Sequence, residues 1–318
     1  MHRDRTCPLL LCTCCLAALL AAGCRDEPAP KPTRRGASAA GGPAGSGGKK
    51  GGPAAPTSGP RGYRIVHVFV ALCDNKHQGI VPVPEALGNG QDAAGNLYWG
   101  ARYGVRTFFR KTGRWREAPA GEVAVSLSDG PAVRDWVLLR RVAAGPPVYL
   151  LAEAYDGARM ELALRRFFQA AAGEMTRAVV WRQERRQVVL RAGGAADLVC
   201  FVGHNGLMDR SPDYFPADAP GPNPAGAVVL ACKSSAYFAG PLKQAACPPL
   251  ITTSGLMAPE AYTLEAIVAA WADGAPPATI HLRAAEAYAR YQKCPLPAAK
   301  KLFVLGAKLP TLGGAAPR

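Results

Sequence analysis

Short, unbroken runs of apolar residues separated by Gly, Pro and polar residues recur through the second half of the chain. Two of them, residues 197–203 and 227–231, read DLVCFVG and AVVLA. Apolar runs of this kind are typical of parallel strands that are buried on both faces. Residues 63–72, 148–154 and 249–254 have the same character, and we predict that they are further strands, with 63–72 near the centre of the sheet.

Helical spacing of apolar residues alternates with these runs. The clearest case is 159–172, where Met160, Leu164, Phe167 and Phe168 form one apolar face and Gly173 follows as a C-cap. The same spacing predicts helices at 97–111, 236–246, 259–272 and 279–291, while 121–128 and 135–142 predict an edge hairpin and 178–181 and 187–191 weaker strands. Alternating strands and helices predict an α/β fold, a three-layer sandwich with a mostly parallel central sheet.

The start of the chain has the features of a processing segment. Arg3 and Arg5 precede an apolar run over 9–22, which is short for a membrane span, and small residues at 21–23 precede Cys24. This pattern resembles the lipobox of bacterial lipoproteins, although Leu20 lies one place further from the cysteine than usual. The resemblance implies cleavage before Cys24 and a lipid on its thiol, which would anchor the protein to a membrane of the bacterial cell envelope, at the outer membrane or the periplasmic face. The alternatives are an ordinary secretory signal and a weak anchor helix.

Residues 25–62 contain Gly, Ala, Pro, Ser and Lys with almost no large apolar side chain. Such a segment cannot bury enough surface to offset the entropy of ordering its backbone, so we predict a disordered tether. Residues 63–318 are rich enough in Val, Leu and Ala to form one large core. The sequence therefore predicts three parts: a signal at 1–24, a tether at 25–62 and a single domain at 63–318.

Charge and cysteine content narrow the classes of function. The formal net charge is +15, but much of the excess lies in the tether, and the chain has no nucleic-acid-binding signature, so we expect no nucleic-acid partner. Five cysteines follow the lipidation candidate, an odd number that predicts at least one unpaired thiol unless a bridge joins two chains. They are Cys73, Cys200, Cys232, Cys247 and Cys294. They have no metal-binding spacing, so we expect neither a metal nor another cofactor.

A histidine and a cysteine directly follow the two strongest strand predictions. His204 follows the run 197–203, and Cys232 follows the run 227–231. Because the carboxyl ends of parallel strands meet at one edge of a sheet, the two side chains are expected at the same edge, where a thiol nucleophile and its base could approach each other. Small residues beside each allow backbone N–H groups to donate to a substrate oxyanion. The alternative for Cys232 is a buried apolar cysteine.

These segments resemble the caspase-like cysteine peptidases, a group that includes legumains, gingipains, clostripain and the caspases. The resemblance is carried by the strand followed by His204 and Gly206, and by the strand followed by Ala231-Cys232-Lys233-Ser234-Ser235. It is extended by Asn75-Lys76-His77-Gln78 and by Thr252-Thr253-Ser254. It implies a caspase-like fold and cleavage of peptide or protein substrates.

The resemblance also implies roles for individual residues. Cys232 would be the nucleophile and His204 the general acid and base, and the N–H groups of Cys232 and Gly206 would line the oxyanion hole. Asn75 or Asn96 would orient the imidazole or the substrate. Thr252, Thr253 and Ser254 would contact the substrate.

The chain also departs from this family. Asn205 stands between His204 and Gly206, where the family has glycine directly after histidine, and the interval from His204 to Cys232 is short. The sequence thus leaves two hypotheses: a cell-envelope cysteine endopeptidase, or a catalytically inactive lipoprotein of the same fold that acts as a binding or scaffold module. A disulfide that includes Cys232 is a third alternative, and it would exclude a nucleophile at this position.

Overall fold

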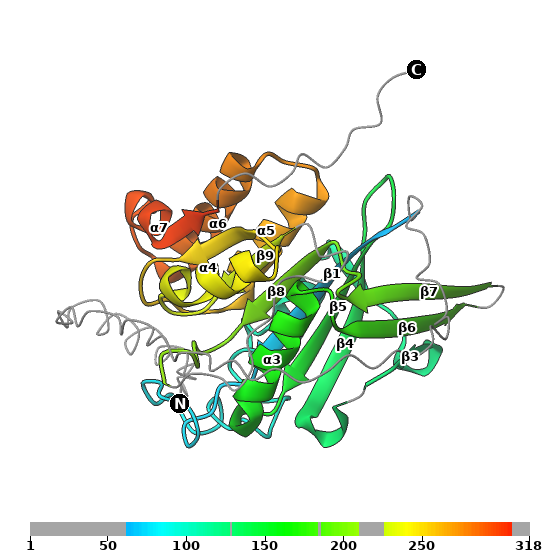
Figure 1. Cartoon of the computed structure of the whole chain (residues 1–318), viewed down its shortest axis with the longest axis horizontal. Helices are drawn as coiled ribbons and strands as arrows, with labels where there is room; N and C mark the ends of the chain where they lie inside the picture. The colour runs from blue at the N-terminus through cyan, green and yellow to red at the C-terminus, as the bar shows by residue number, and fades with distance from the viewer. Residues whose placement is uncertain (1–61, 128, 184–185, 210–225, 307–318) are drawn as a thin grey trace, which may run out of the picture. The chain divides into compact units, whose positions relative to one another are not determined.

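The strand β1 (Arg64–Ala71) lies inside an eight-stranded sheet (Figure 1). This computed structural model describes residues 62–127, 129–183, 186–209 and 226–306, so the predicted signal and nearly all of the predicted tether lie outside it. The strand order among the described residues is β11-β10-β9-β8-β1-β5-β4-β2. Five of these strands are mutually parallel: β1, β5 (Val148–Tyr155), β8 (Leu198–Val202), β9 (Ala227–Leu230) and β10 (Pro249–Thr253). Antiparallel pairs complete the two sides, with β11 (Phe303–Leu305) against β10, and β4 (Val133–Arg141) between β5 and β2 (Trp115–Glu117).

Helices cover both faces of this sheet. Alternate residues of β1 enter two separate cores: Val66, Val68 and Val70 on one face, and Ile65 and Phe69 on the other. The first core is closed by α2 (Val105–Lys111), α5 (Ala261–Ala272), α6 (Pro277–Gln292) and α7 (Leu296–Leu302). The second is closed by α3 (Met160–Ala171) and α4 (Ser234–Gln244). The predicted α/β class with a mostly parallel sheet is confirmed.

A second, smaller sheet contains β3 (Val123–Val125), β6 (Thr176–Gln183) and β7 (Arg186–Gly193) in that order. The prediction of an edge hairpin at 121–128 and 135–142 is wrong, because β3 pairs with β6 whereas β4 pairs with β5. The reason is that β3 and β4 pack against different partners, each in a different sheet. Val123 lies opposite Trp181 in the small sheet, while β4 buries Val137, Leu138 and Leu139 in the main one.

The predicted helix at 97–111 is also shorter than expected. Only Val105–Lys111 is helical, and the preceding residues form turns around the buried side chain of Asn96. Its amide oxygen accepts the N–H groups of Cys73 at 3.0 Å and Tyr98 at 3.1 Å. A side chain that satisfies backbone donors in this way competes with helix formation.

A buried ion network connects the small sheet to the main one. Arg177 of β6 forms a bidentate ion pair with Glu153 of β5, in which Nε lies 2.8 Å from Oε1 and Nη2 lies 3.0 Å from Oε2. The Nε2 atom of His67 lies 3.4 Å from the same carboxylate, and its Nδ1 accepts the Gly193 N–H at 3.1 Å. All three charged or titratable side chains are at most 2% exposed, so removing one partner would leave its neighbours charged and out of water.

No described helix has the combination of length and apolar character that crossing a bilayer requires.

The network makes stability depend on pH in a defined direction. Burial works to raise the pKa of Glu153, but His67 and Arg177 outweigh it and hold that pKa below its ordinary value of 4.5. Ionised Glu153 therefore stabilises the fold fully above about pH 4.5, and this contribution is lost as pH falls through the lower folded-state pKa. We expect Glu153→Gln to lower the free energy of unfolding by about 3–5 kcal/mol at pH 7. Denaturant titrations of both proteins from pH 7 to 3 should show this difference narrowing below about pH 4.5.

The matched control is Glu286→Gln, which removes the carboxylate from an exposed pair with Arg283. Exposed pairs of this kind contribute about 0–1 kcal/mol. Equal losses in the two variants, or a Glu153→Gln difference that does not change with pH, would contradict the stabilising role of the network.

Candidate active site

His204 and Cys232 occupy equivalent positions on two neighbouring strands. The parallel pair β8 and β9 is aligned so that Val202 lies opposite Leu230, and the next residues but one are His204 and Cys232. Cys200 and Val202, like Val228 and Leu230, face the same core, so the last residues of the two strands are in step. Among the hydrogen bonds of the described residues, none joins the His204 ring to the Cys232 thiol, and the two side chains share the carboxyl edge of the sheet without direct contact there.

This position is also at the point where the sheet topology reverses. The chain passes from β1 to β5 on one side of β1, and then to β8, β9 and β10 on the other. In open α/β sheets, ligands bind outside the carboxyl ends of the strands at such a point. The loops after β1 and β8 meet there, because the Gly79 N–H donates to Asp209 Oδ2 at 3.1 Å.

The Cys232 thiol is half-buried and is held by the loop after β10. The Met257 N–H donates to Sγ at 3.4 Å, and the S–H group lies 3.5 Å from the Met257 carbonyl. Burial raises the pKa of this thiol above its ordinary value of 9.0, so the resting form at neutral pH is the neutral thiol. All five body cysteines are free, which argues against the predicted disulfide alternative.

His204 is anchored by Asp209, a residue of the loop that follows β8. Its Nε2 atom lies 2.9 Å from Asp209 Oδ2, and the imidazole is 7% exposed. Because Asp209 also accepts the Gly79 N–H, its position is fixed from two strands. The contact with Asp209 engages Nε2 and leaves Nδ1 as the nitrogen for a second partner.

Asn205, the residue that separates this chain from the family pattern, joins the two strand ends. It is fully buried, and its Nδ2 donates to the Cys232 carbonyl at 2.6 Å while its Oδ1 accepts the Leu207 N–H at 3.1 Å. Gly206 follows in a tight turn in which its N–H donates to the His204 carbonyl at 3.1 Å. The predicted oxyanion donor at Gly206 is thus already used, and a Cβ at this position would overlap Met160 of α3.

Neither predicted orienting asparagine contacts the His204 ring in the hydrogen bonds of the described residues. Asn75 exchanges two hydrogen bonds with the backbone of Val83, at 2.8 and 3.0 Å. Asn96 donates to the carbonyls of Cys73 and Asn89 and accepts two N–H groups. Both amides therefore shape the long loop after β1.

The predicted substrate-contacting residues also have internal partners. Thr253 is fully buried and hydrogen-bonds with Ser234 at the start of α4, and Thr252 is 2% exposed. Ser254 is exposed, but its hydroxyl donates to the carbonyls of Lys301 and Leu302. Thr253 thus ties β10 to α4, and Ser254 ties the residue after β10 to the end of α7, so the hydroxyls of both already have partners within the fold.

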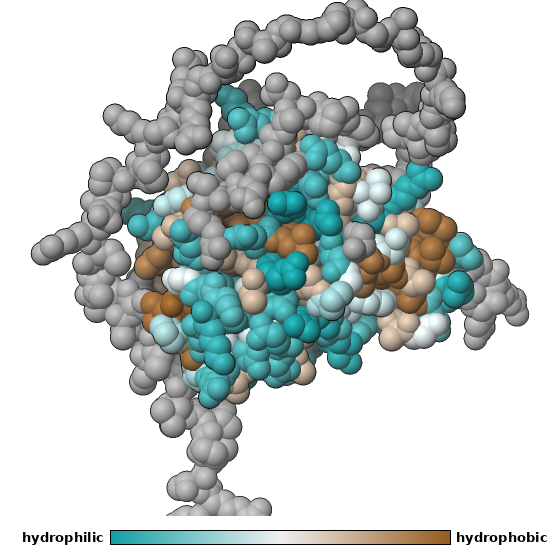
Figure 2. Space-filling model, turned by 60° about the horizontal axis from the view of Figure 1, so that its bottom comes forward, coloured by the Kyte–Doolittle hydropathy of each residue, from teal (hydrophilic) through white to brown (hydrophobic). Residues whose placement is uncertain are grey.

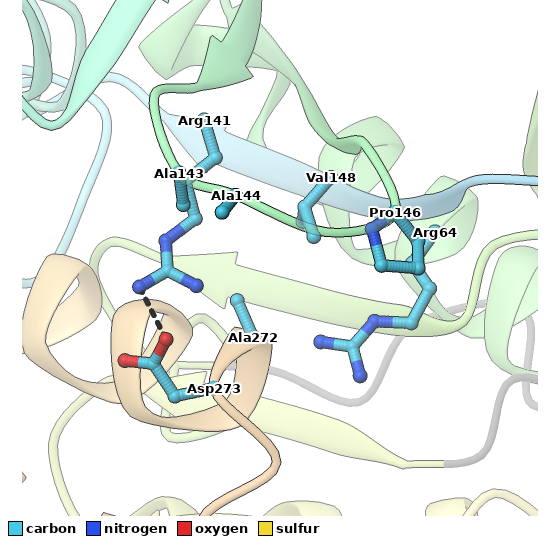
Figure 3. Close-up of a pocket in the computed structure, with 8 residues that line it drawn as sticks. All are labelled: Arg64, Arg141, Ala143, Ala144, Pro146, Val148, Ala272 and Asp273. Carbon is cyan, nitrogen blue, oxygen red and sulfur yellow. Dashed lines mark hydrogen bonds and ion pairs between the residues drawn. The ribbon is translucent and has the colours of Figure 1, made fainter.

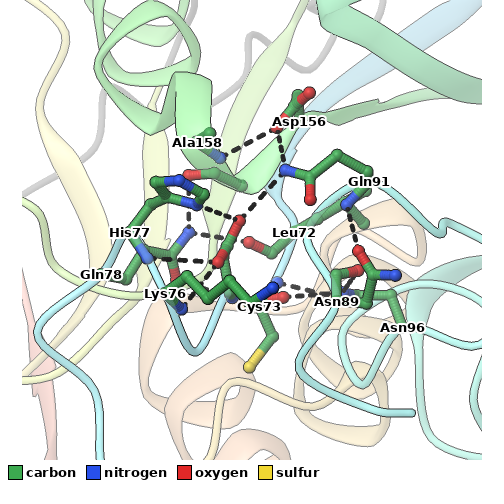
Figure 4. Close-up of polar contacts among 12 residues, drawn as sticks. Leu72, Cys73, Lys76, His77, Gln78, Asn89, Gln91, Asn96, Asp156 and Ala158 are labelled. Atoms are coloured by element: carbon green, nitrogen blue, oxygen red, sulfur yellow. Dashed lines mark hydrogen bonds and ion pairs between the residues drawn. The ribbon is translucent and has the colours of Figure 1, made fainter. Parts of the chain in front are cut away.

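A second polar cluster lies at the same edge of the sheet, in the stretch that follows β1 (Figure 4). Asp74 directly follows Cys73, is 2% exposed and accepts the N–H of Lys76 at 2.8 Å. Its Oδ2 lies 3.0 Å from His77 Nδ1 and accepts Gln91 Nε2 at 3.2 Å, and Gln91 also donates to Asp156 at 2.8 Å. Burial opposes ionisation, but these hydrogen bonds lower the pKa of Asp74 overall.

A cavity of about 270 Å³ lies at the opposite, amino edge of the sheet (Figure 3). Arg141 pairs there with Asp273 at 2.7 Å, and Arg64 lies over the Trp271 ring at 4.1 Å and donates to the Trp271 carbonyl at 3.0 Å. Both guanidinium groups hold the carboxyl end of α5, so this cavity is a structural junction far along the strands from Cys232.

The loops around the candidate site carry exposed apolar side chains. Val81, Met208 and Leu256 follow β1, β8 and β10 and are 58%, 37% and 45% exposed. Figure 2 turns the lower side of Figure 1 forward, and its surface is mostly hydrophilic with apolar residues in separate groups.

No family model, curated protein or solved structure matches this chain. The described residues contain no group of three or more His, Cys, Asp or Glu side chains arranged to hold a metal ion. The chemistry of the site must therefore be inferred from its own geometry.

Thiol alkylation should follow the exposure and pKa of each cysteine. Cys73, Cys200 and Cys247 are buried, and burial raises the pKa of Cys73 to about 11 and that of Cys247 to about 12. We expect iodoacetamide to label only Cys232 and Cys294 among these five residues. Because the thiolate is the reactive form, the labelling rate at Cys232 should rise about tenfold per pH unit from pH 7 to 9.

Peptide mapping by mass spectrometry measures both rates in one sample, with Cys294 as the internal comparison. A rate at Cys232 that reaches a plateau below pH 8 would show a thiolate already formed and would contradict a neutral resting thiol.

Proposed function

We propose that this protein is a cysteine peptidase with a caspase-like fold, in which Cys232 is the nucleophile and His204 the general acid and base. The observation that supports the proposal is the alignment of β8 with β9, because His204 and Cys232 follow the paired residues Val202 and Leu230 at equivalent positions of the same sheet edge. Convergence of a thiol and an imidazole at the carboxyl edge of a parallel sheet is what thiol-based acyl transfer requires.

The neutral thiol determines how the reaction would start. His204 accepts the S–H proton as Sγ attacks the substrate carbonyl carbon, and the carbonyl π electrons move to its oxygen. The tetrahedral intermediate collapses when the C–N bond breaks and His204 returns the proton to the leaving amine. His204 then takes a proton from water as the water oxygen attacks the thioester carbon. When the C–S bond breaks, His204 returns that proton to Sγ, which releases the acid and restores the thiol.

Asp209 would be the orienting group for this proton transfer. Its carboxylate holds His204 Nε2, and Nδ1 is left to exchange the proton with Sγ. It would also stabilise the imidazolium that forms during attack.

The N–H of Cys232 is the proposed oxyanion donor. The Gly206 N–H would join it only after substrate binding opens its bond to the His204 carbonyl. The exposed side chains of Val81, Met208 and Leu256 offer apolar contacts for a peptide that crosses this edge.

A second candidate function is a binding or scaffold module of the same fold without catalytic activity. The observation that favours it is the closed hydrogen-bonding of the turn after His204, where Asn205 and Gly206 both use their polar groups internally. Such a turn holds a shape without offering a preformed oxyanion hole.

Substitution of the two residues separates these functions. In a peptidase, Cys232→Ala and His204→Asn should each lower kcat/KM on a mixed fluorogenic peptide library by about 10⁴-fold or more. The full chain is assayed before and after limited proteolysis, and Cys294→Ser is the matched control because it removes the other half-exposed thiol. Turnover that is equal in the wild type and Cys232→Ala would refute the nucleophile, and absent turnover in all variants would favour the binding module.

We also propose that the chain is lipid-anchored through Cys24 in the bacterial cell envelope. The support is the small-residue segment before Cys24 and the basic, Pro- and Gly-rich stretch that follows it.

Metabolic labelling with an alkyne-bearing fatty acid tests this anchor in a bacterial host. The wild type should acquire the label and partition into the detergent phase, whereas Cys24→Ala should remain unlabelled and aqueous. Equal labelling of both proteins would contradict an anchor at Cys24.

A further inference from the structure

The loop that holds the Cys232 thiol also carries a carboxylate. Met257 contacts the sulfur through its backbone, and Glu260 follows three residues later, directly before α5. Two backbone bonds fix this loop: the Ala258 N–H donates to Tyr288 Oη at 3.2 Å, and the Glu260 N–H donates to the Ala258 carbonyl at 2.8 Å. The positions of the thiol and the carboxylate are therefore coupled.

The Glu260 carboxylate is half-buried and receives only neutral donors among the described residues. Tyr262 Oη donates to its Oε2 at 3.0 Å, and Gln292 Nε2 donates to the same atom at 3.3 Å. Gln292 and Tyr262 are themselves hydrogen-bonded at 2.5 Å, which orients both donors.

Glu260 differs in this respect from the other buried and half-buried carboxylates that the structure describes. Each of those lies beside an Arg or His side chain, and a buried carboxylate without a cation is costly. They are Asp74 with His77, Glu117 and Asp135 with Arg106, Asp129 with Arg166, Glu153 with Arg177, Asp156 with Arg134, Asp197 with Arg64 and Glu265 with Arg114.

Two tyrosines connect this carboxylate to the thiol. Tyr98 and Tyr288 are both buried, and burial is the main cause of their raised pKa values, to about 12 for Tyr288. The charges of Cys232 and Glu260 both add to the rise at each phenol. Tyr288 also contacts the loop between the two groups directly, because its Oη accepts the N–H of Ala258, which lies between Met257 and Glu260 in the sequence.

We propose that Glu260 is a specificity-determining residue that selects substrates with a cationic side chain, Lys or Arg, at the residue whose carbonyl Cys232 attacks. This inference rests on the proposed peptidase function. A guanidinium or ammonium group would supply the charge that the fold does not, whereas an acidic side chain would be repelled. The Tyr98 and Tyr288 rings would contact the aliphatic part of the side chain.

The carboxylate also predicts the pH dependence of this selection. Burial raises the pKa of Glu260 above 4.5, against the opposing hydrogen bond from Tyr262. The preference for a cation should therefore weaken as pH falls and Glu260 takes up a proton.

The test compares the wild-type full chain with Glu260→Gln on fluorogenic peptides that differ only in the residue before the cleaved bond: Arg, Lys, Leu or Asp. We expect Arg and Lys peptides to be cleaved at least about thirtyfold faster than the Leu peptide, and Glu260→Gln to remove this difference. Glu260→Asp retains the charge and should keep part of the preference. Glu286→Gln, the matched control, should leave it unchanged, and thermal unfolding of each variant checks that it is folded.

A binding measurement separates failure of this inference from failure of the peptidase proposal. Butylguanidine should slow iodoacetamide labelling of Cys232 in the wild type but not in Glu260→Gln, whereas the uncharged butylurea should have no effect on either. Protection without any peptide cleavage would support the cation site and refute only the peptidase.

Three results would overturn the role of Glu260. They are cleavage without a cationic preference, a preference that persists in Glu260→Gln, and absence of both cleavage and butylguanidine protection.

Discussion

The parallel pairing of β8 with β9 is the constraint on which the candidate site depends. With Val202 opposite Leu230, His204 and Cys232 each stand two residues beyond the last paired residues of β8 and β9, at one edge of the sheet. A slip of one residue in this pairing would offset the two along the strands and turn the buried side chains of one strand to the other face. The Asn205 amide fixes this alignment beyond the last paired residues by bonding the Cys232 carbonyl.

Burial on both faces made the central strands predictable. β1, β5, β8, β9 and β10 each contain a nearly continuous apolar run, and α3 shows its apolar face by spacing alone. The elements that the sequence concealed depend on partners far along the chain. β2 and β11 have three residues each, and β3 pairs with β6 although two strands of the other sheet, β4 and β5, lie between them in the sequence. The turns before α2 result from one amide, Asn96, which a pattern of apolar spacing does not register.

Some features of the candidate site could likewise be predicted from the sequence, and others could not. Strand ends placed His204 and Cys232 at one edge, since this needs only local strand assignment and parallel topology. The contact of His204 with Asp209 was hidden because Asp209 is held by Gly79, which lies 130 positions away. Asn75, Thr253 and Ser254 have suitable chemistry, but neighbouring groups within the fold already form hydrogen bonds with them. Residue type shows which bonds a side chain can form and not which partner lies near enough to form them.

The distribution of charge distinguishes scaffold from site. Among the described residues, most buried carboxylates lie beside an arginine or a histidine, and the most deeply buried example is the ion pair of Arg177 with Glu153. Near Cys232, Glu260 is not paired with a basic side chain in this way. The thiol remains neutral because burial disfavours its charged form, and Glu260 has only phenol and amide donors. A buried polar group without an oppositely charged neighbour lowers the stability of the fold. Such groups are typical of functional sites, where a ligand or a reaction step provides the opposite charge. In the proposed reaction, the positive charge beside the sulfur forms on His204 when the imidazole takes the thiol proton. The positive charge beside Glu260 comes from a cationic substrate side chain.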